Sequence, residues 1–323
     1  MKAAVHSRYG PPDVVRIADV DEPTVGAGDV LVKVHATTVN RTDCGYRAAK
    51  PFFIRLLTGL ARPRRQVLGT EFAGVVTAVG GGVSSFAAGD RVFGYNEGPF
   101  GTHAEYVSVA EDGAIAAMPE GAAFDVAAAG TEGSHYALSA LRTAGIAAGQ
   151  DALVYGATGA IGSAAVQLLK VLDVTVTAVC DAANLEWVRD LGPDRVVDYT
   201  AQDFTADQQR YDLVLDAVGK STFGRCRRLL KPGGVYMSSD LGPGWQNIPL
   251  TLVTPLFRGK RVKFGVPVQN KEMVEYFRDL IESGRFRPVI DRRYPLDEIV
   301  DAYRYVETGQ KTGNVVIEVV PPS

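Results

Sequence analysis

The sequence predicts an α/β protein in which a β-rich, barrel-like domain carries an inserted domain built on a doubly wound parallel sheet. Short β-branched runs separated by glycine-rich turns fill residues 1–122. From residue 123 onward, apolar strands alternate with helices, which is the pattern of βαβ units around a parallel sheet. The closing segment ends in another strand-like run. We therefore predict one domain from residues 1–122 and 270–323, and a second from residues 123–269.

In the first domain, the predicted strands are Asp29–Val34, Phe72–Val79, Arg91–Phe93 and Ala104–Val109. The segment Lys50–Gln66 mixes apolar residues with arginines. We interpret it as a helix that covers the barrel edge. A mobile lid over the substrate entrance and a short membrane-surface helix are the alternatives.

The second domain begins with the strand Asp151–Gly156 and the apolar helix Ala160–Val171. LKPGG at 230–234 reads as a helix stop followed by the start of a strand. The remaining expected strands of this domain are Val174–Cys180, Val196–Tyr199, Asp212–Asp216, Gly234–Ser239 and Arg261–Val268, and the remaining expected helices are Leu185–Leu191 and Phe223–Leu230. In the closing segment of the first domain we expect the helix Lys271–Glu282 and the strand Asn314–Val320.

Composition excludes several classes of protein. The 323 residues carry a net charge of −3, so no nucleic-acid partner is expected. No apolar run is long enough to span a bilayer, and MKAAVHSRYG has no apolar core of a signal peptide. The cysteines Cys44, Cys180 and Cys226 are too far apart for a zinc-finger or disulfide pattern. We expect reduced thiols and a cytoplasmic enzyme.

A glycine-rich loop joins the strand Asp151–Gly156 to the helix that follows it. Backbone N–H groups in such a loop approach a pyrophosphate, which then lies at the positive end of the helix. The pattern is GxxGxxG rather than strict GxGxxG, but its strand–turn–helix context supports a dinucleotide site. The predicted cofactor-binding residues of this loop are Gly156, Ala157, Thr158, Gly159, Ala160, Ile161 and Gly162.

Asp181 ends the second strand, 19 positions after Gly162. A carboxylate there accepts hydrogen bonds from ribose hydroxyls and repels a 2′-phosphate, so it favours NAD(H) over NADP(H). The alternative is that Asp181 only caps the next helix, and Arg189 is the next basic residue that could reach a phosphate. Gly219-Lys220-Ser221 reads as a turn rather than a phosphate loop, because Val214 stands where the first glycine is required.

Several ordered motifs resemble the medium-chain dehydrogenase/reductase superfamily across essentially the whole chain. GDVLVKVHATTVN, LGTEFAGVVTAVG, AAGDRVFGY and GTHAEYV resemble its barrel segments, and GATGAIG, DLVLDAVG, LKPGG and TGNVVIEV its cofactor-domain and closing motifs. The resemblance implies a GroES-like β-barrel domain with an inserted Rossmann domain, and a homodimer joined through the last cofactor-domain strand. It adds further cofactor-binding positions: Tyr199, Ala217, Val218, Gly219 and Asn314.

The zinc-dependent branch of that superfamily has Cys, His and Cys ligands. The matching positions here hold Asn40, Thr70 and, less securely aligned, Gly130. These residues cannot replace thiolate and imidazole at a catalytic zinc, so we predict no metal and the zinc-independent, quinone oxidoreductase-like branch. Relatives that use NADPH often have Ser and Arg or Lys after the second strand, and Asp181-Ala182-Ala183 departs from that pattern.

Without a metal to polarise a simple ketone, hydride transfer suits quinones and α,β-unsaturated carbonyls. The candidate catalytic residues are Asn40 and Tyr46 in NRTDCGYR, and His135 as a proton donor. Packing alone would also explain Tyr46 and His135, and Asp43 fits a role in orienting the loop. We therefore predict an NAD(P)H-dependent quinone or enone reductase. A cofactor-binding module that senses redox state or binds a partner, with little turnover, is the alternative.

Overall fold

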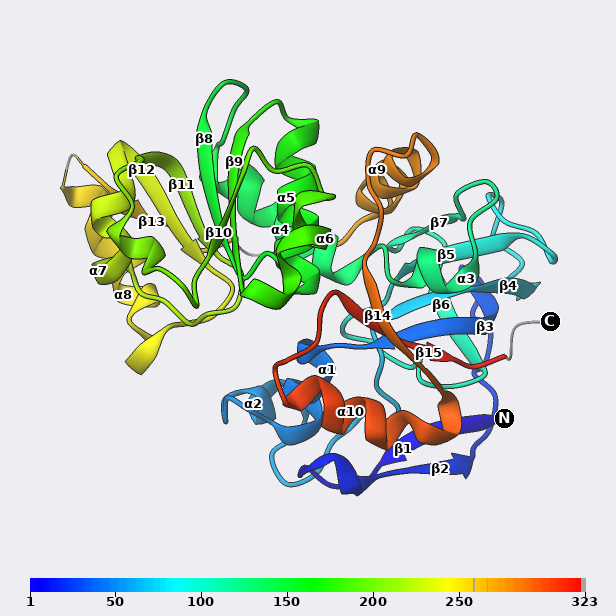
Figure 1. The fold of residues 1–323 in the computed structure, drawn as a ribbon. Helices are drawn as coiled ribbons and strands as arrows, with labels where there is room; N and C mark the ends of the chain where they lie inside the picture. Colours follow the sequence, from blue (N-terminus) through cyan, green and yellow to red (C-terminus); the bar gives the residue numbers. More distant parts are fainter. Residues whose placement is uncertain (258, 266, 321–323) are drawn as a thin grey trace. The chain divides into compact units, whose positions relative to one another are not determined.

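Two units make up the structure, a computed structural model that describes residues 1–257, 259–265 and 267–320 (Figure 1). Met1–Glu132 and the segment that begins at Gln269 form the β-rich unit, and Gly133–Val268 form the α/β unit. The α/β unit is thus inserted within the β-rich one. The sequence-based boundaries at 122/123 and 269/270 stay a prediction, and the predicted ranges include residues 258, 266 and 321–323, which lie outside the described residues.

The β-rich unit contains a seven-stranded sheet in the order β14-β15-β3-β4-β5-β7, with β6 paired to β3. The C-terminal strand β15 pairs antiparallel with β3, so segments before and after the inserted unit contribute to one sheet. Alternate residues such as Val30, Val32 and Val34 point into its core. The strands are β3 (Asp29–Val39), β4 (Glu71–Val79), β5 (Arg91–Tyr95), β6 (Tyr106–Ala110), β7 (Ile115–Ala117), β14 (Ile290–Pro295) and β15 (Asn314–Glu318).

A separate antiparallel pair, β1 (Lys2–His6) and β2 (Val15–Asp19), begins the chain. The helices of this unit are α1 (Arg41–Ala48), α2 (Ile54–Thr58), α3 (Phe124–Ala128), α9 (Lys271–Glu282) and α10 (Ile299–Glu307). Helix α3 follows the predicted boundary at 122/123, yet it packs on β3 and β4 and so groups with the β-rich unit.

The α/β unit is built on a six-stranded sheet in the order β10-β9-β8-β11-β12-β13, with every pair parallel. The strand order reverses between β8 and β11, and in such sheets ligands bind outside the carboxyl ends of the strands at this switch point. The strands are β8 (Asp151–Tyr155), β9 (Thr175–Cys180), β10 (Arg195–Asp198), β11 (Tyr211–Asp216), β12 (Leu230–Ser238) and β13 (Arg261–Val262).

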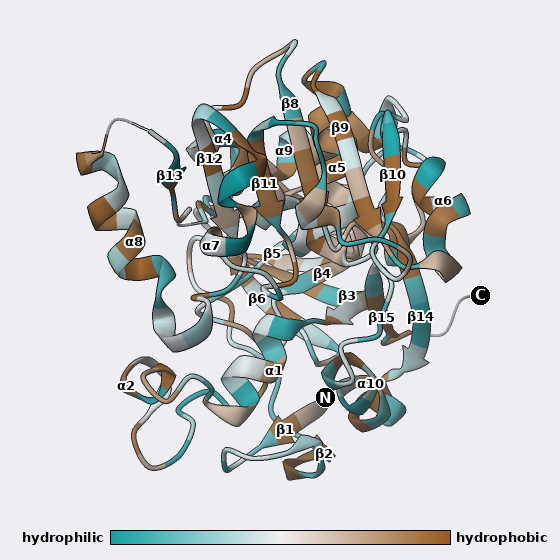
Figure 2. Ribbon diagram, turned by 60° about the vertical axis from the view of Figure 1, so that its left-hand side comes forward, coloured by the Kyte–Doolittle hydropathy of each residue, from teal (hydrophilic) through white to brown (hydrophobic). Residues whose placement is uncertain are grey.

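Apolar residues dominate the central strands of this sheet, which are largely brown in Figure 2. Leu153, Val179 and Val214 are buried in its core. The helices are α4 (Glu132–Ala144), α5 (Ala160–Val171), α6 (Leu185–Arg189), α7 (Phe223–Cys226) and α8 (Asn247–Val253). In the described part of the chain, no helix has both the length and the apolar composition to cross a membrane.

Several predictions about elements were wrong in extent; for example, β3 continues to Val39, and of the predicted helix Phe223–Leu230 only Phe223–Cys226 is α-helical. β12 begins at Leu230, not at Gly234, because its register on β11 jumps from Tyr211↔Leu230 to Leu213↔Val235 and LKPGG continues the strand through an irregularity. Of the predicted strand 261–268, only β13 is a strand; residue 266 lies outside the described residues. In the segment 50–66 only α2 is α-helical, since Gly59 ends that helix with a φ of +126°.

Candidate functional site

Two of the three loop glycines between β8 and α5 are required by packing. Gly156 has a φ of +83°, and a Cβ there would lie 2.4 Å from Cγ1 of Val218. A Cβ on Gly162 would lie 2.0 Å from the Gly156 carbonyl oxygen. A Cβ on Gly159 would meet no heavy atom closer than 3.8 Å. The space beside Gly159 is therefore open, and a ligand group could approach the loop backbone there.

The N-terminus of α5 suits an anion. Gly159 is the N-cap residue and provides no side-chain acceptor for the first N–H groups of this twelve-residue helix. Those N–H groups and the helix dipole favour a negative charge. The loop and the helix end therefore fit the pyrophosphate of a dinucleotide.

The other predicted cofactor residues of this unit lie at the same edge of the sheet. Asp181 follows β9, Tyr199 follows β10, and Ala217, Val218 and Gly219 follow β11. Carboxyl ends of neighbouring parallel strands meet at one edge, so the structure brings these loops together. The Ala217 N–H donates to the Tyr155 carbonyl at 2.9 Å, which joins the β8 and β11 loops directly.

Buried Asp216 fixes the loop after β11. Its carboxylate accepts hydrogen bonds from the backbone N–H groups of Ser221 at 2.7 Å and of Val218 and Lys220 at 3.3 Å each. Burial raises the pKa of this carboxyl, and the backbone donors oppose that rise. The GKS segment is thus a turn built on Asp216, as expected.

Asp181 belongs to a hydrogen-bonded chain that the sequence did not reveal. It occupies an N-cap position, but its side chain makes no capping bond to the backbone. Its Oδ1 accepts from Asn184 Nδ2 at 2.7 Å, and Asn184 Oδ1 accepts from Trp187 Nε1 at 2.6 Å. Asn184 and Trp187 therefore orient the carboxylate. The three-residue spacing of Asp181, Asn184 and Trp187 was the available signal.

Asn40 is the N-cap residue of α1 and is 3% exposed. Its Oδ1 accepts from the Asp43 N–H at 2.8 Å, and Asp43 Oδ2 accepts from the Asn40 N–H at 3.1 Å. Asn40 Nδ2 donates to Thr70 Oγ1 at 2.9 Å. An amide nitrogen has two hydrogens, so this arrangement fixes the side chain and leaves one N–H for another acceptor.

Tyr46 lies two turns further along α1. Its hydroxyl donates to Glu97 Oε1 at 3.2 Å, and its ring packs edge-on against Phe100 at 4.7 Å between centroids. Burial and the Glu97 carboxylate raise the pKa of Tyr46 to about 12. The hydroxyl therefore keeps its proton at neutral pH and can act as a donor.

Sequence reasoning missed a buried carboxyl pair, Glu71 and Glu132. Glu71 is fully buried and accepts from the Thr38 hydroxyl, from both the hydroxyl and the backbone N–H of Thr131, and from the Glu132 N–H. Burial and the Glu71 carboxylate raise the pKa of Glu132 to about 8, against the opposing effects of Lys311 and the Thr42 hydroxyl. Glu132 thus holds a proton at neutral pH. Its place three residues before the predicted His135 was the available signal.

The remaining predicted residues lie elsewhere. His135 is fully buried on α4 in the α/β unit, with its ring 4.4 Å from that of Tyr136. Asn314 begins β15 in the β-rich unit, and its Nδ2 donates to the carbonyls of Val289 at 3.0 Å and Ala129 at 3.3 Å. The catalytic role of His135 and the cofactor role of Asn314 stay predictions.

Known proteins are similar to this chain in sequence and in fold. Residues 26–120 match the alcohol dehydrogenase GroES-like domain, and residues 191–317 match the zinc-binding dehydrogenase family. The chain is 33% identical to 2-methylene-furan-3-one reductase of Solanum lycopersicum, over 99% of this chain and 80% of that protein. It is 31% identical to the NADPH-dependent alkenal/one oxidoreductase, chloroplastic, of Arabidopsis thaliana, over the same shares. The chain belongs to the medium-chain dehydrogenase/reductase superfamily.

Within this medium-chain dehydrogenase/reductase superfamily, the chain lies in the quinone oxidoreductase-like branch, and it is an oxidoreductase. The quinone oxidoreductase from Coxiella burnetii superimposes with a TM-score of 0.89 at 28% identity, over 99% of each chain. The glycine loop therefore fits a nicotinamide dinucleotide as the cofactor.

The positions of two zinc ligands of the superfamily are in direct contact here. Asn40 and Thr70, which stand where the zinc-dependent branch has Cys and His, form the 2.9 Å hydrogen bond described above. Amide and hydroxyl groups are poor ligands for catalytic zinc. Among residues 1–257, 259–265 and 267–320, no group of three or more His, Cys, Asp or Glu side chains is arranged to hold a metal ion.

Proposed function

We propose that this medium-chain reductase transfers a hydride from NAD(P)H to a quinone or an α,β-unsaturated carbonyl. The observation that carries the proposal is the hydrogen-bonded pair of Asn40 and Thr70, which replaces two metal-ligand positions with neutral donors. The names of the Solanum lycopersicum and Arabidopsis thaliana relatives support the substrate class.

Asn40 acts on the acceptor carbonyl. When bound, NAD(P)H supplies the hydride from C4 of its nicotinamide ring. The remaining amide N–H of Asn40 donates to the carbonyl oxygen, where negative charge develops as the hydride reaches the β-carbon. Because Asn40 is buried and held by Asp43 and Thr70, it needs no reorientation to do so.

Tyr46 delivers the proton that completes the reduction. It lies on the same helix as Asn40, and its raised pKa keeps its hydroxyl protonated at neutral pH. The single hydroxyl hydrogen is donated to Glu97 in the structure. It must turn from Glu97 to the substrate to be delivered. His135 is the alternative donor.

NADH is the preferred cofactor in this proposal. Asp181 Oδ1 is held by Asn184, and none of the hydrogen bonds found among the described residues involves Asp181 Oδ2. That oxygen is left to accept from a ribose hydroxyl, and its negative charge disfavours a 2′-phosphate. The Arabidopsis thaliana relative is named as NADPH-dependent, so the proposed preference for NADH rests on Asp181 alone.

A homodimer is the proposed assembly. β13 is the edge strand of the parallel sheet, and α8 packs beside it. The helix and the turn after it expose the large apolar side chains Ile248, Leu252, Leu256 and Phe257. In Figure 2, parts of the α8 ribbon have the brown colour of hydrophobic residues. A reducing compartment such as the cytoplasm fits the three cysteines, which are free and buried.

An acceptor panel tests the proposal. Consumption of NADH and NADPH, followed by absorbance, should depend on an added quinone or enone and fall at least a hundredfold in Asn40→Ala. Binding of both cofactors without turnover of any acceptor would instead favour the redox-sensing module.

A further inference from the structure

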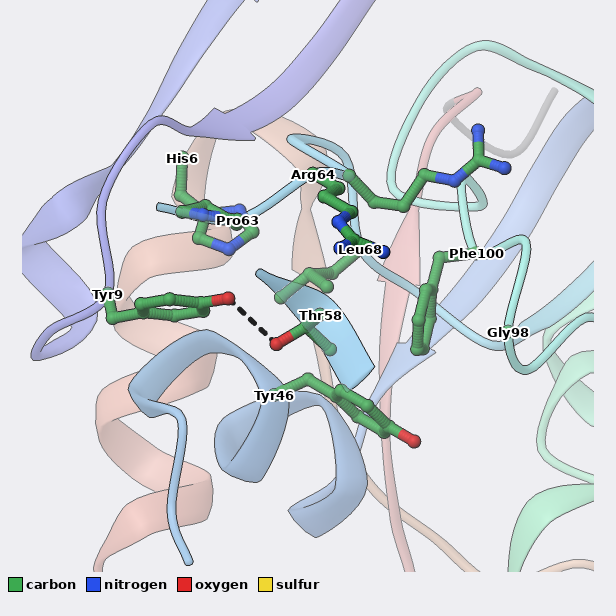
Figure 3. Close-up of a pocket in the computed structure, with 10 residues that line it drawn as sticks. His6, Tyr9, Tyr46, Thr58, Pro63, Arg64, Leu68, Gly98 and Phe100 are labelled. Carbon is green, nitrogen blue, oxygen red and sulfur yellow. Dashed lines mark hydrogen bonds between the residues drawn. The ribbon is translucent and has the colours of Figure 1, made fainter. Parts of the chain in front are cut away.

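A cavity of about 400 Å³ lies beside Tyr46 in the β-rich unit (Figure 3). Its walls come from β1 and the loop after it, from α1, from the segment 58–68, and from the loop at 98–100. Tyr9, Tyr46 and Phe100 supply aromatic surface, and Leu68 and Pro63 supply apolar surface. A volume of this size and a mostly apolar lining with a few polar groups are typical of small-molecule sites.

The cavity has a fixed frame. The His6 N–H donates to the Gln66 carbonyl at 2.9 Å, and the Arg64 N–H donates to the Thr58 carbonyl at 2.8 Å. The Tyr9 hydroxyl donates to the Gly59 carbonyl at 2.7 Å and contacts the Thr58 hydroxyl, the bond drawn in Figure 3. The bonds of His6 and Tyr9 hold the segment 58–66 to β1 and the loop after it, and the Arg64–Thr58 bond closes the segment on itself.

His6 forms part of the cavity wall. The residue is 2% exposed, and its Nδ1 lies 2.8 Å from the Gln66 carbonyl oxygen. A carbonyl only accepts, so Nδ1 carries the hydrogen, and burial lowers the pKa of the ring and keeps it neutral. Nε2 is then an acceptor, and it has no hydrogen-bond partner among the described residues. Because this nitrogen is shielded from solvent, we assign His6 to the wall of the cavity and not to ligand binding.

Two arginines line the same cavity on its exposed side. No ion pair and no side-chain hydrogen bond joins Arg64 or Arg65 to any other described residue, whereas Arg195, Arg293 and Arg304 each pair with an aspartate. The nearby carboxylate of Glu97 accepts from Tyr46, Tyr95 and Gln269. The guanidinium groups of Arg64 and Arg65 thus remain available to an anion.

We propose that this cavity is the subsite for the acidic end of the acceptor, whose carboxylate or phosphate binds Arg64 and Arg65. The inference rests on the proposed function, and it narrows the substrate to an anionic enone or quinone. Tyr46 lines the cavity as well, so the subsite adjoins the proposed proton donor.

The test compares an enone acid with its neutral ester. The substrates are 4-(3-oxobut-1-enyl)benzoate and its methyl ester, assayed with wild type, with R64Q/R65Q and with R62Q. Arg62 is an exposed arginine of the same segment that does not line the cavity, so it is the matched control. We expect the double variant to raise KM for the acid about tenfold, with kcat and the KM for the ester unchanged, and R62Q to change neither. R64K/R65K should recover part of the loss. An equal effect on acid and ester, or no effect on either, would overturn the subsite.

Binding of a non-reacting acid separates this subsite from the reaction itself. Calorimetry measures the affinity for 4-(3-oxobutyl)benzoate, the saturated analogue, without turnover. The same measurement with 4-(3-oxobutyl)phenyl phosphate tests a phosphate in place of the carboxylate. Arginine-dependent binding without enone turnover would support the subsite and reject the proposed reaction. Turnover that is insensitive to charge and to both arginines would support the reaction and reject the subsite. If the phosphate binds more tightly than the carboxylate, the natural group is a phosphate, and if it binds more weakly, the natural group is a carboxylate. If neither acid binds more tightly than the neutral ester, the proposal is rejected.

Discussion

Asp181 is the residue on which the cofactor preference depends, because its free carboxylate oxygen lies at the end of β9 where the cofactor ribose is expected. Replacing it by Ser while converting Ala183 to Arg removes the negative charge and adds a cation for a 2′-phosphate. The ratio of kcat/KM for NADPH to that for NADH should rise at least tenfold. An unchanged ratio would contradict the role assigned to Asp181.

The carboxyl of Glu132 makes stability depend on pH. Its folded pKa of about 8 lies above that of an unfolded glutamate, so the folded chain binds more protons and loses stability as pH rises between about 4.5 and 8. Glu71, Glu97, Lys311 and Thr42 are the groups that act on it. Glu132→Gln removes this titration.

We therefore expect the free energy of unfolding of E132Q, relative to wild type, to increase from pH 5.5 to 7.5 by at most about 1.4 kcal/mol per pH unit. Urea titrations across this range measure it. Glu22→Gln, at an exposed position, serves as the control and should show no such trend. A constant difference between E132Q and wild type would contradict the assignment.

At the residue scale, the sequence allowed us to predict those functional side chains whose position follows from neighbouring residues in the chain. Asp181, Asn40 and the glycines stand at fixed offsets from strands and helices. Glu71 and Glu132 meet only because β4 and the start of α4 come together, and His6 reaches Gln66 across 60 residues. No local pattern encodes such contacts.

At the scale of elements, the β8–α5 loop offers a matched pair of substitutions. Gly162→Ala places a Cβ against the Gly156 carbonyl, so the free energy of unfolding should fall by about 3 kcal/mol. The Cβ added by Gly159→Ala meets open space, so the free energy of unfolding should change by less than about 1 kcal/mol. The same Cβ fills the space through which a ligand would approach the loop backbone.

Cofactor affinity therefore separates the two glycines. G159A should fold normally and bind NADH at least tenfold more weakly, as measured by cofactor fluorescence, with thermal unfolding as the control. G159A with wild-type affinity would show that the pyrophosphate does not approach this glycine.

Elements with strong local signals could be predicted from the sequence. Ala160–Val171 and Lys271–Glu282 were predicted with their correct bounds, because each has apolar periodicity and clear ends. The segment 50–66 misled, because its apolar residues suggested one helix while glycine and prolines divide it. The extension of β12 through KPGG depends on its pairing with β11, which the sequence does not display.

At the scale of the whole molecule, the proposed dimer depends on the apolar surface of α8 and the turn after it. Leu252 and Leu256 are 73% and 78% exposed in the single chain. Sedimentation equilibrium should show a dimer for wild type and a monomer for L252D/L256D. Leu60→Asp, equally apolar and exposed but in the β-rich unit, should remain dimeric. A monomeric wild type would contradict the assembly.

The insertion of one unit within the other could be predicted from the sequence, because the pattern changes from short β-branched strands to alternating strands and helices and then ends in another strand. The strand-like end of the chain predicted a strand near residue 314, but its pairing with β3 could not be predicted from the sequence. The cavity beside Tyr46 was not accessible, since its walls come from four separate segments.

Deuterium transfer tests the central claim most directly. The protein is incubated with NADH dideuterated at C4 of the nicotinamide and with 4-phenyl-3-buten-2-one, and the product is analysed by mass spectrometry and NMR. We predict 4-phenylbutan-2-one with one deuterium on the carbon β to the carbonyl. Deuterium on the carbonyl carbon of an alcohol product, or bound cofactor with no labelled product, would contradict the account.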